Sequence, residues 1–357
     1  MTTLFSSAQL GPLALHNRMV MAPMTRLRAK DTLAQPIMAT YYAQRASAGL
    51  IVSECTMVSP MSSGYMGCPG IYTPAQAEAW KPVVAAVHDA GGKMFLQLWH
   101  CGRVAHPSLL GGELPVAPSA IAGKGTLHGP EGKVSLDTPR ALAIDEIPGI
   151  VEEFRQGAEN AKAAGFDGVE LHGAFGYLID QFLQDGSNHR EDDYGGPVEN
   201  RARFLLEVVD AAISVWGGDR VGIKLSPSNT FYGMKDSDPK ATFTHVLKAL
   251  EPKGLAYVHL MEPNEKDREQ DVIDPVVPTF SPEYSGTVIA NGGFDHQSGD
   301  RILETGHAAL VSFGKLYIAN PDLPQRFQQD TPLNEPNPKT FYGDGEEGYT
   351  DYPFWEG

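Results

Sequence analysis

The chain has 357 residues, of which 42% are hydrophobic, 20% charged and 9% aromatic, and its formal net charge is −16. This apolar fraction excludes intrinsic disorder, and an acidic chain without any cluster of Lys and Arg argues against a nucleic-acid partner. The length fits one α/β barrel with insertions, so we expect residues 1–357 to form a single domain.

The lack of a targeting signal and the small number of cysteines lead us to expect a reducing compartment. The first residues lack a cationic segment followed by an apolar run, and no apolar run of about 18 residues follows. Cys55, Cys68 and Cys101 are too few and too widely spaced for a disulfide framework or a C-x-x-C metal site. We therefore expect a cytoplasmic protein with no membrane partner and no bound metal.

Short apolar runs rich in β-branched residues alternate with helical patterns along the chain. The predicted strands are residues 18–24, 50–58, 94–99, 167–172, 221–226, 256–261, 286–290 and 308–313. The predicted helices are 36–48, 74–90, 145–164, 199–216, 238–250, 296–305 and 321–329, with Asp145, Ser237 and Asn320 as N-cap residues. Such alternation implies parallel pairing, and we predict a (β/α)8 TIM barrel.

A doubly wound open sheet would also alternate, but one that binds a dinucleotide carries G-x-G-x-x-G after its first strand. The first predicted strand instead ends in Pro23-Met-Thr25. Such a glycine pattern occurs only at Gly343, Gly345 and Gly348, where it follows no strand and carries carboxylates that would repel a pyrophosphate. The open sheet is therefore the weaker prediction.

Two stretches do not alternate. They are 100–144, rich in Gly and Pro after the third strand, and 330–357, an aromatic and acidic tail. Long irregular segments in compact domains are usually lids or binding loops. We expect 100–144 to cap the barrel and 330–357 to lie near its mouth.

Polar residues stand at the C-terminal ends of the predicted strands, where barrel enzymes carry their catalytic groups. They are Thr25, Gln97, His172 and Lys224. Alternation of side chains along each strand directs Gln97, His172 and Lys224 inward. A lysine is rarely buried without an anionic partner or a chemical role, so their joint occurrence predicts an active site at the barrel mouth.

The last two predicted strands end in glycine turns, Ala290-Asn-Gly-Gly-Phe294 and Ser312-Phe-Gly-Lys315. Loops after strands seven and eight form the usual phosphate site of such barrels. Glycines let backbone N–H groups approach a phosphate closely, and a lysine adds positive charge. The predicted phosphate-binding residues are Asn291, Gly292, Gly293, Phe313, Gly314 and Lys315.

Six segments carry a family resemblance. They are Asn17-Arg-Met-Val-Met-Ala-Pro-Met-Thr-Arg26, Tyr41-Tyr-Ala-Gln-Arg-Ala-Ser-Ala-Gly-Leu-Ile51, Gln97-Leu-Trp-His-Cys-Gly-Arg103, Tyr177-Leu-Ile-Asp180, Asn188-His-Arg-Glu-Asp-Asp-Tyr-Gly-Gly196 and Ile318-Ala-Asn-Pro-Asp322. Over nearly the whole chain they resemble the Old Yellow Enzyme family of FMN-dependent ene-reductases. The resemblance implies non-covalent FMN, reduction by NADPH or NADH, and hydride transfer from flavin N5 to the β-carbon of an electron-poor alkene. Enones, enals, maleimides and nitroalkenes are the expected substrates.

The resemblance also implies which residues hold the flavin. Pro23, Met24 and Thr25 would lie beside its ring, with Thr25 bonding the O4 edge. The pyrimidine side would meet Cys55 and Gln97. Lys224 would be the cation near N1 and O2, where negative charge collects on reduction.

On the substrate side, the resemblance implies that His172 donates to the carbonyl or nitro oxygen and that Tyr177 protonates the α-carbon. A tyrosine, with a reference pKa of about 10, is protonated at neutral pH and can act as such an acid. Tyr65, Trp99 and Tyr349 match positions that line the substrate pocket, although simple packing explains each of them as well.

The chain departs from the family pattern at Phe175. The motif that starts at the donor histidine reads His-x-x-Asn or His-x-x-His in the family and His172-Gly-Ala-Phe175 here. Phe175 cannot donate a hydrogen bond, and losing one oxyanion donor costs about 10²- to 10³-fold in rate. Candidate replacements are His128, Asn188 and a bound water. Lys224 and Lys315 also stand where arginine is commoner, which keeps the charge but loses the planar fork.

Two alternatives remain open from the sequence. A desolvated Lys224 at a barrel strand end could form a Schiff base in a lyase. A flavoprotein with Phe175 could instead be an isomerase or have low reductase activity. The sequence leaves the physiological substrate, the choice between NADPH and NADH, and the choice between monomer and homodimer undetermined.

Overall fold

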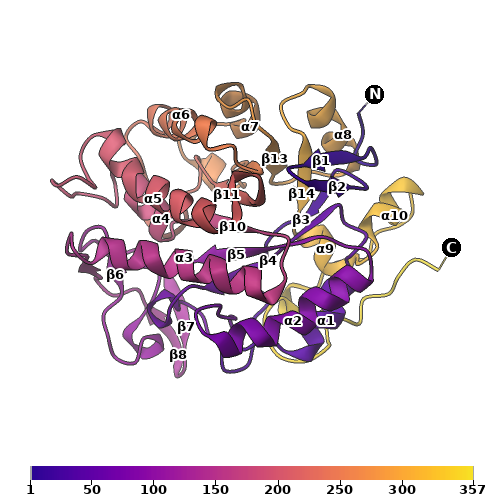
Figure 1. Ribbon diagram of the computed structural model, residues 1–357, viewed down its shortest axis with the longest axis horizontal. Coiled ribbons are helices and arrows are strands. Elements are labelled where there is room, and N and C mark those ends of the chain that lie inside the picture. Colours follow the sequence, from indigo (N-terminus) through magenta and orange to yellow (C-terminus); the bar gives the residue numbers. More distant parts are fainter. Residues whose placement is uncertain (1, 357) are drawn as a thin grey trace.

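Eight parallel strands close into a barrel in the computed structural model, which describes residues 2–356 (Figure 1). The strands are β3 (Met19–Met21), β4 (Leu50–Met57), β5 (Met94–Trp99), β10 (Gly168–Gly173), β11 (Val221–Leu225), β12 (Tyr257–Met261), β13 (Val288–Asn291) and β14 (Leu310–Phe313). They pair in chain order, and β14 pairs with β3 to complete the cylinder. The predicted (β/α)8 barrel is confirmed, and each predicted strand overlaps one barrel strand.

Helices surround the cylinder (Figure 1). They are α1 (Pro36–Ala43), α2 (Pro74–Asp89), α3 (Ile147–Ala164), α4 (Leu178–Leu183), α5 (Val198–Trp216), α6 (Pro239–Leu250), α7 (Val276–Phe280), α8 (His296–Glu304), α9 (Lys315–Ala319) and α10 (Leu323–Gln328). In α3 the buried residues Ile150, Phe154, Ala158 and Ala161 recur every three or four positions, so one face packs inward. Among residues 2–356, none of the helices combines the length and hydropathy that crossing a membrane requires.

Three predicted N-cap residues are wrong by one or two positions. The caps are Glu146 rather than Asp145, Asp238 rather than Ser237, and Asp322 rather than Asn320. Each of these helices has a proline in its first two positions. Proline is pre-organised for the first turn, so its position rather than the nearest polar residue sets where the helix begins.

A hairpin that the periodicity did not predict fills the N-terminal end of the barrel. It consists of β1 (Ala8–Leu10) and β2 (Leu13–Leu15), which pair antiparallel. Its leucines pack against residues at the start of the barrel strands, including Val20, Phe95 and Tyr257, in one buried apolar cluster. The opposite end, where the strands finish, is left for the functional residues.

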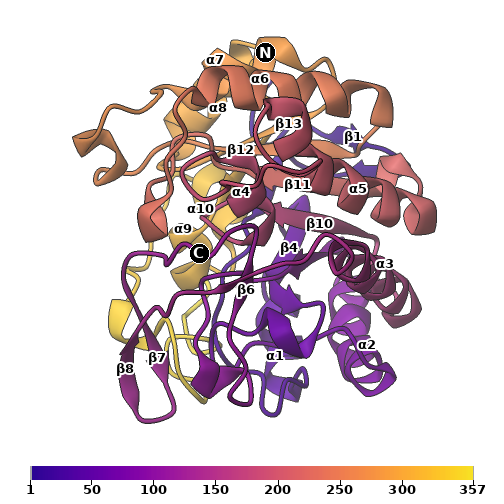
Figure 2. The same cartoon turned by 90° about the vertical axis from the view of Figure 1, so that its left-hand side faces the viewer.

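The 100–144 excursion contains short strands of its own. β6 (Val116–Ala117) pairs with β9 (Arg140–Ala141), and β7 (Thr126–Gly129) forms a hairpin with β8 (Gly132–Ser135). Figure 2 shows this hairpin projecting at one edge of the molecule. The backbone N–H of Lys124 donates to the carbonyl of Tyr232 at 2.9 Å, which ties the excursion to the loop after β11.

Candidate active site

Polar side chains form two neighbouring levels inside the C-terminal half of the barrel. In strand order, these are Cys55, Gln97 and Glu170 at one level and His172, Lys224 and His259 at the next. All six are at most 6% exposed. The structure therefore brings together Cys55, Gln97, His172 and Lys224, four of the residues singled out in the sequence.

A continuous hydrogen-bonded chain crosses the barrel from β4 to β14. The Cys55 thiol donates to Gln97 Oε1 at 3.0 Å, and Gln97 Nε2 donates to Glu170 Oε1 at 2.7 Å. His259 bonds Glu170 Oε2 through Nδ1 at 2.8 Å and Ser312 Oγ through Nε2 at 2.7 Å. His259 and Ser312 were not singled out from the sequence, because only the register places them opposite Glu170.

The barrel mouth holds one buried anion and one buried cation. Burial alone would raise the pKa of Glu170, but His259, Lys224 and the hydrogen bond from Gln97 hold it below its ordinary value. Burial lowers the pKa of Lys224, and the charge of Glu170 opposes that shift. Among residues 2–356, no hydrogen bond or ion pair engages Lys224 Nζ, so this ammonium remains free to meet an anionic ligand.

His172 is a neutral hydrogen-bond donor. Burial, and then the charge of Lys224, lowers its pKa to about 3, so the ring carries no charge at neutral pH. The backbone N–H of Ala174 donates to His172 Nδ1 at 3.3 Å, which makes Nδ1 the acceptor. A neutral imidazole then carries its hydrogen on Nε2, and Nε2–H is the donor available to a ligand.

Tyr177 lies directly beside His172, their ring centroids 4.9 Å apart and their planes at 81°. It caps the N-terminus of α4, and two buried side chains of that helix hold the preceding turn. Asp180 accepts the Gly176 N–H at 2.8 Å, and Gln181 donates to the Gly176 carbonyl at 2.7 Å. The sequence had indicated neither as a positioning residue, since the helix is only six residues long.

Aromatic rings surround Tyr177. Trp99 meets it edge to face at 5.1 Å between centroids, and Tyr65 stacks on Trp99 at 5.8 Å. The Tyr65 and Tyr177 hydroxyls are 3.3 Å apart, and Tyr65 also bonds the hydroxyl of Tyr232. The structure thus joins the predicted Tyr65 and Trp99 to the site and adds Tyr232, which the sequence analysis had missed.

Phe175 occupies a left-handed backbone conformation, with φ 58°. Its N–H donates to Ser226 Oγ at 2.9 Å, and its ring centroid lies 6.0 Å from that of His172. The Lys224 ammonium lies 5.5 Å from the same ring. An apolar ring therefore lies beside both the donor histidine and the buried cation.

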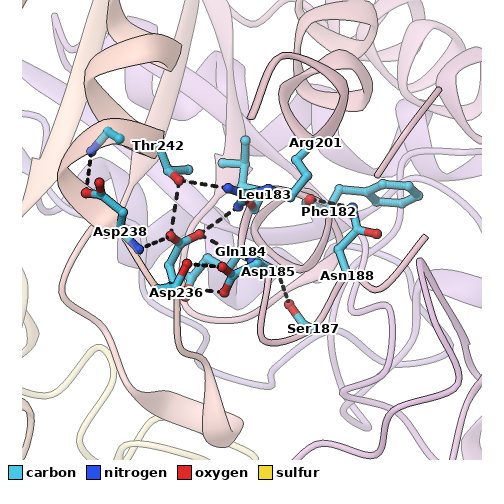
Figure 3. Close-up of polar contacts among 12 residues, drawn as sticks. Phe182, Leu183, Gln184, Asp185, Ser187, Asn188, Arg201, Asp236, Asp238 and Thr242 are labelled. Carbon is cyan, nitrogen blue, oxygen red and sulfur yellow. Dashed lines mark hydrogen bonds and ion pairs between the residues drawn. The ribbon is translucent and has the colours of Figure 1, made fainter. Parts of the chain in front are cut away.

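Neither side chain considered as a replacement donor reaches the pocket. Asn188, drawn in Figure 3, uses both amide hydrogens: Nδ2 donates to the carbonyls of Phe182 and Tyr194, each at 2.7 Å. His128 is exposed on β7, opposite Lys133 in the hairpin. Within residues 2–356, the structure supports neither Asn188 nor His128 as the missing donor.

Tyr349 is not brought into this group. It is fully buried and stacks on Tyr41, with ring centroids 4.0 Å apart. The guanidinium groups of Arg28 and Arg26 lie 4.4 Å and 5.1 Å from its ring. Arg26 also donates to the Gly348 carbonyl at 2.7 Å, so this cluster fastens the C-terminal tail to the barrel.

The turns after β13 and β14 leave room for a phosphate. Gly292 and Gly293 have φ of 108° and 73°, and a Cβ on Gly293 would meet nothing within 4 Å. A Cβ on Gly314 would meet only the Met24 side chain, 3.5 Å away at its sulfur, and Lys315 is exposed at the start of α9. Asn291 and Ser312 are register partners, so the two turns are adjacent.

Residues beside these turns suit a flavin ring. Pro23, Met24 and Thr25 are partly exposed directly after β3. Burial raises the pKa of Cys55 to about 12, opposed by a hydrogen bond with Thr25, so Cys55 is a neutral thiol. Together with Lys224, these groups offer hydrogen bonds and one positive charge beside an open phosphate cradle. The residues present therefore fit FMN, and a closed barrel with such a mouth is the arrangement that a flavin-dependent oxidoreductase requires.

Comparison with known proteins identifies the family. Residues 3–334 match the NADH:flavin oxidoreductase / NADH oxidase family. The chain is 45% identical to 12-oxophytodienoate reductase 1 of Oryza sativa subsp. japonica over 359 residues, covering 99% of this chain and 93% of the relative. It is 42% identical to 12-oxophytodienoate reductase 2 of Arabidopsis thaliana over 362 residues, covering 99% and 96%.

Solved structures agree. The structure is similar to morphinone reductase with a TM-score of 0.95 at 47% identity, covering 99% of this chain and 96% of that one. It is similar to the old yellow enzyme homologue of Zymomonas mobilis with a TM-score of 0.95 at 41% identity, covering 98% and 99%. The chain belongs to the Old Yellow Enzyme family of FMN-dependent, NAD(P)H-dependent ene-reductases.

Proposed function

We propose that this protein reduces enones, enals, maleimides and nitroalkenes, with His172 binding the activating oxygen and Tyr177 protonating the α-carbon. The observation that carries the proposal is the edge-to-face pair of His172 and Tyr177, 4.9 Å between centroids, at the mouth of the barrel. One residue supplies a neutral N–H donor and the other a phenol, side by side. An electron-poor alkene needs these two functions at neighbouring atoms.

FMN, when bound, supplies the hydride that it has received from NAD(P)H. Pro23, Met24, Thr25, Cys55, Gln97 and Lys224 would hold its ring, and Asn291, Gly292, Gly293, Phe313, Gly314 and Lys315 its phosphate. Lys224 brings a positive charge to a water-poor site, where it is worth more than in solution. The Lys224 charge is itself supported by Glu170.

His172 Nε2–H would polarise the substrate oxygen without changing its own charge. Tyr177 would give its proton to the α-carbon as negative charge develops there. Burial raises the pKa of Tyr177 well above its ordinary value, so the phenol is intact at neutral pH. Trp99 packs edge to face on Tyr177 and Tyr65 stacks on Trp99, so aromatic rings line this side of the pair.

Phe175 sets the substrate preference in this proposal. With His172 as the one side-chain donor at the oxygen, simple ketones gain less stabilisation, by about 10²- to 10³-fold in rate. Alkenes that carry two activating groups or a nitro group depend less on the second donor. We therefore rank maleimides and nitroalkenes above cyclic enones.

A second candidate function rests on the same residue. Because Phe175 removes a donor, an FMN-bound isomerase or weakly active flavoprotein is the alternative within the family. The lyase hypothesis for Lys224 is left without support, since the charge of Glu170 opposes deprotonation of its ammonium and the family is one of flavin enzymes.

One anaerobic experiment tests the proposal. The purified protein should be yellow, NADPH or NADH should bleach it, and N-ethylmaleimide or a nitroalkene should restore the colour and yield the saturated product. Reduced protein that none of these alkenes reoxidises would favour the isomerase alternative. Folded, colourless protein that refuses added FMN would contradict the cofactor assignment itself.

A further inference from the structure

Three tyrosine hydroxyls form a continuous chain that starts at the proposed acid. The Tyr65 hydroxyl lies 3.3 Å from that of Tyr177 and within hydrogen-bonding distance of that of Tyr232. Trp99 contacts the rings of both Tyr65 and Tyr177, so their relative position is fixed by packing. The two hydrogen bonds run in the order Tyr177, Tyr65, Tyr232, and the Tyr232 ring also lies beside that of Tyr177, 6.2 Å between centroids.

The far end of this chain is held in place at an energetic cost. Tyr232 has φ 57° and ψ 22°, a left-handed conformation that costs a non-glycine residue about 1–2 kcal/mol. Its carbonyl accepts hydrogen bonds from Lys124 N at 2.9 Å and from Arg103 Nη2 at 3.4 Å. Strain of this kind persists where the surroundings impose it, and it concentrates at functional sites.

The row of tyrosine hydroxyls also leads from Tyr177 towards the protein surface. Tyr232 is partly exposed, and its neighbour Phe231 is 46% exposed at the surface of the loop after β11. A substrate seated on His172 and Tyr177 would cover Tyr177 from the pocket side. The hydroxyls of Tyr65 and Tyr232 would then connect Tyr177 to solvent.

We propose that Tyr65 and Tyr232 form a proton relay that returns a proton to Tyr177 as Tyr177 protonates the substrate. The proposal rests on the proposed function, in which Tyr177 is the acid. Tyr65 and Tyr232 are positioning and relay residues, because they act through Tyr177 rather than on the reacting carbon.

Each bond in the relay is accounted for. The Tyr177 O–H breaks as the α-carbon–H bond forms, and the Tyr65 O–H breaks as the Tyr177 O–H is restored. The Tyr232 O–H then restores that of Tyr65, and a solvent water restores that of Tyr232 and leaves as hydroxide. These steps transfer protons only and oxidise or reduce no group, since the hydride is delivered separately.

The relay also requires one direction of hydrogen bonding at rest. A phenol has a single hydrogen, so Tyr177 can point its own at the substrate only if it accepts from Tyr65. Tyr65 must then accept from Tyr232. Burial raises the pKa of all three hydroxyls, so each retains the hydrogen that it passes on.

The test uses the full-length, FMN-loaded protein in anaerobic stopped-flow measurements. Wild type, Tyr232→Phe and Tyr65→Phe are each reduced with NADH and mixed with saturating enone in water and in water–D2O mixtures. Tyr72→Phe is the matched control, because Tyr72 packs in the same apolar cluster and its hydroxyl makes no hydrogen bond to residues 2–356. Reduction by NADH and reoxidation by ferricyanide serve as reactions that need no proton from Tyr177.

We expect Tyr232→Phe to slow enone-dependent reoxidation about 5- to 10-fold, the order of one lost hydrogen bond. Its plot of rate against deuterium fraction should become linear, whereas that of wild type is curved because several protons move. The rates of NADH reduction and of ferricyanide reoxidation should be the same in Tyr232→Phe as in wild type. Tyr72→Phe should match wild type in all three reactions. The double variant Tyr65→Phe/Tyr232→Phe should be no slower than Tyr65→Phe alone, because the two hydroxyls act in series.

The relay is overturned if Tyr232→Phe behaves like Tyr72→Phe, or if it slows all three reactions alike. An additive double variant also overturns it, since independent pocket contacts would then explain both residues. Failure of the proposed function looks different, because neither enone nor N-ethylmaleimide would then reoxidise even the wild-type protein while ferricyanide still does.

Discussion

The ammonium of Lys224 lies 5.5 Å from the centre of the Phe175 ring, over its face. Both residues replace the types that the family pattern leads one to expect, and they replace them in contact with each other. The face of the ring gives the lysine a favourable neighbour. The two departures therefore form one local rearrangement.

Replacing Phe175 by Asn should raise both carbonyl affinity and stability. Asn tolerates the left-handed conformation at φ 58° better than Phe and adds the missing donor. We expect at least about a tenfold gain in kcat/KM for cyclohexenone. Phe175→Leu, which adds no donor, is the control. Equal gains for both variants would contradict the role assigned to the amide.

Replacing Lys224 by Met should weaken FMN binding and destabilise the apoprotein. Glu170 would lose a buried charge that helps to hold its pKa down, so its carboxylate would be less stabilised in the folded protein. The measurements are FMN titration by fluorescence and urea unfolding. Lys224→Arg preserves the charge and should retain FMN. Loss of FMN binding in that variant would show that the shape of the side chain, rather than its charge, determines FMN affinity.

The affinity for an uncharged enone should be flat from about pH 5 to 8. The pKa of His172 is lowered to about 3 from 6.5, so the ring is the same neutral donor throughout that range. Protonation favours the unfolded chain, so this histidine costs stability as the pH falls from about 6.5 towards 3. An affinity that changes with a midpoint near 6.5 would mean that the folded histidine titrates normally.

Asp180 should affect the pH dependence of folding stability in the opposite sense to His172. Burial raises its pKa to about 7 from 3.8, so protonation favours the folded state. Its stabilising contribution, complete below about pH 3.8, is lost as the pH rises towards 7. Asp180→Asn should therefore lower the free energy of unfolding more at pH 5 than at pH 8, by roughly 2 kcal/mol. A pH-independent difference would contradict the raised pKa.

Substitutions of Tyr349 can distinguish a residue that lines the substrate pocket from one that fastens the C-terminal tail. Its hydroxyl makes no hydrogen bond to residues 2–356, so Tyr349→Phe should leave KM unchanged and alter stability by less than about 1 kcal/mol. Tyr349→Ala should cost about 3 kcal/mol or more and expose the tail to proteolysis. A raised KM in the Phe variant would restore the pocket role suggested by the sequence.

The strands were predictable and the helix starts and loop residues were not. β5 coincides with the predicted residues 94–99 because a buried parallel strand is a continuous apolar run. The helices α4, α7 and α9 have at most six residues, too few to show a 3.6-residue period. Their existence depends on tertiary contacts.

The candidate site follows the same division. His172, Lys224 and Gln97 could be found because alternation along a strand fixes their direction. Tyr232 could not, since it follows β11 in an irregular loop and meets Tyr65 across 167 positions of sequence. Similarly, the amide of Asn188 is occupied by the carbonyls of Phe182 and Tyr194, and only the folded loop brings these carbonyls to it.

The β1–β2 hairpin has a kinetic consequence. Its leucines close the N-terminal end of the barrel, and the barrel interior is a packed core rather than a channel, so small molecules can reach the polar residues only from the C-terminal end. Under the proposed function, the nicotinamide and the alkene would therefore compete for this one entrance, and we expect an excess of either to inhibit turnover.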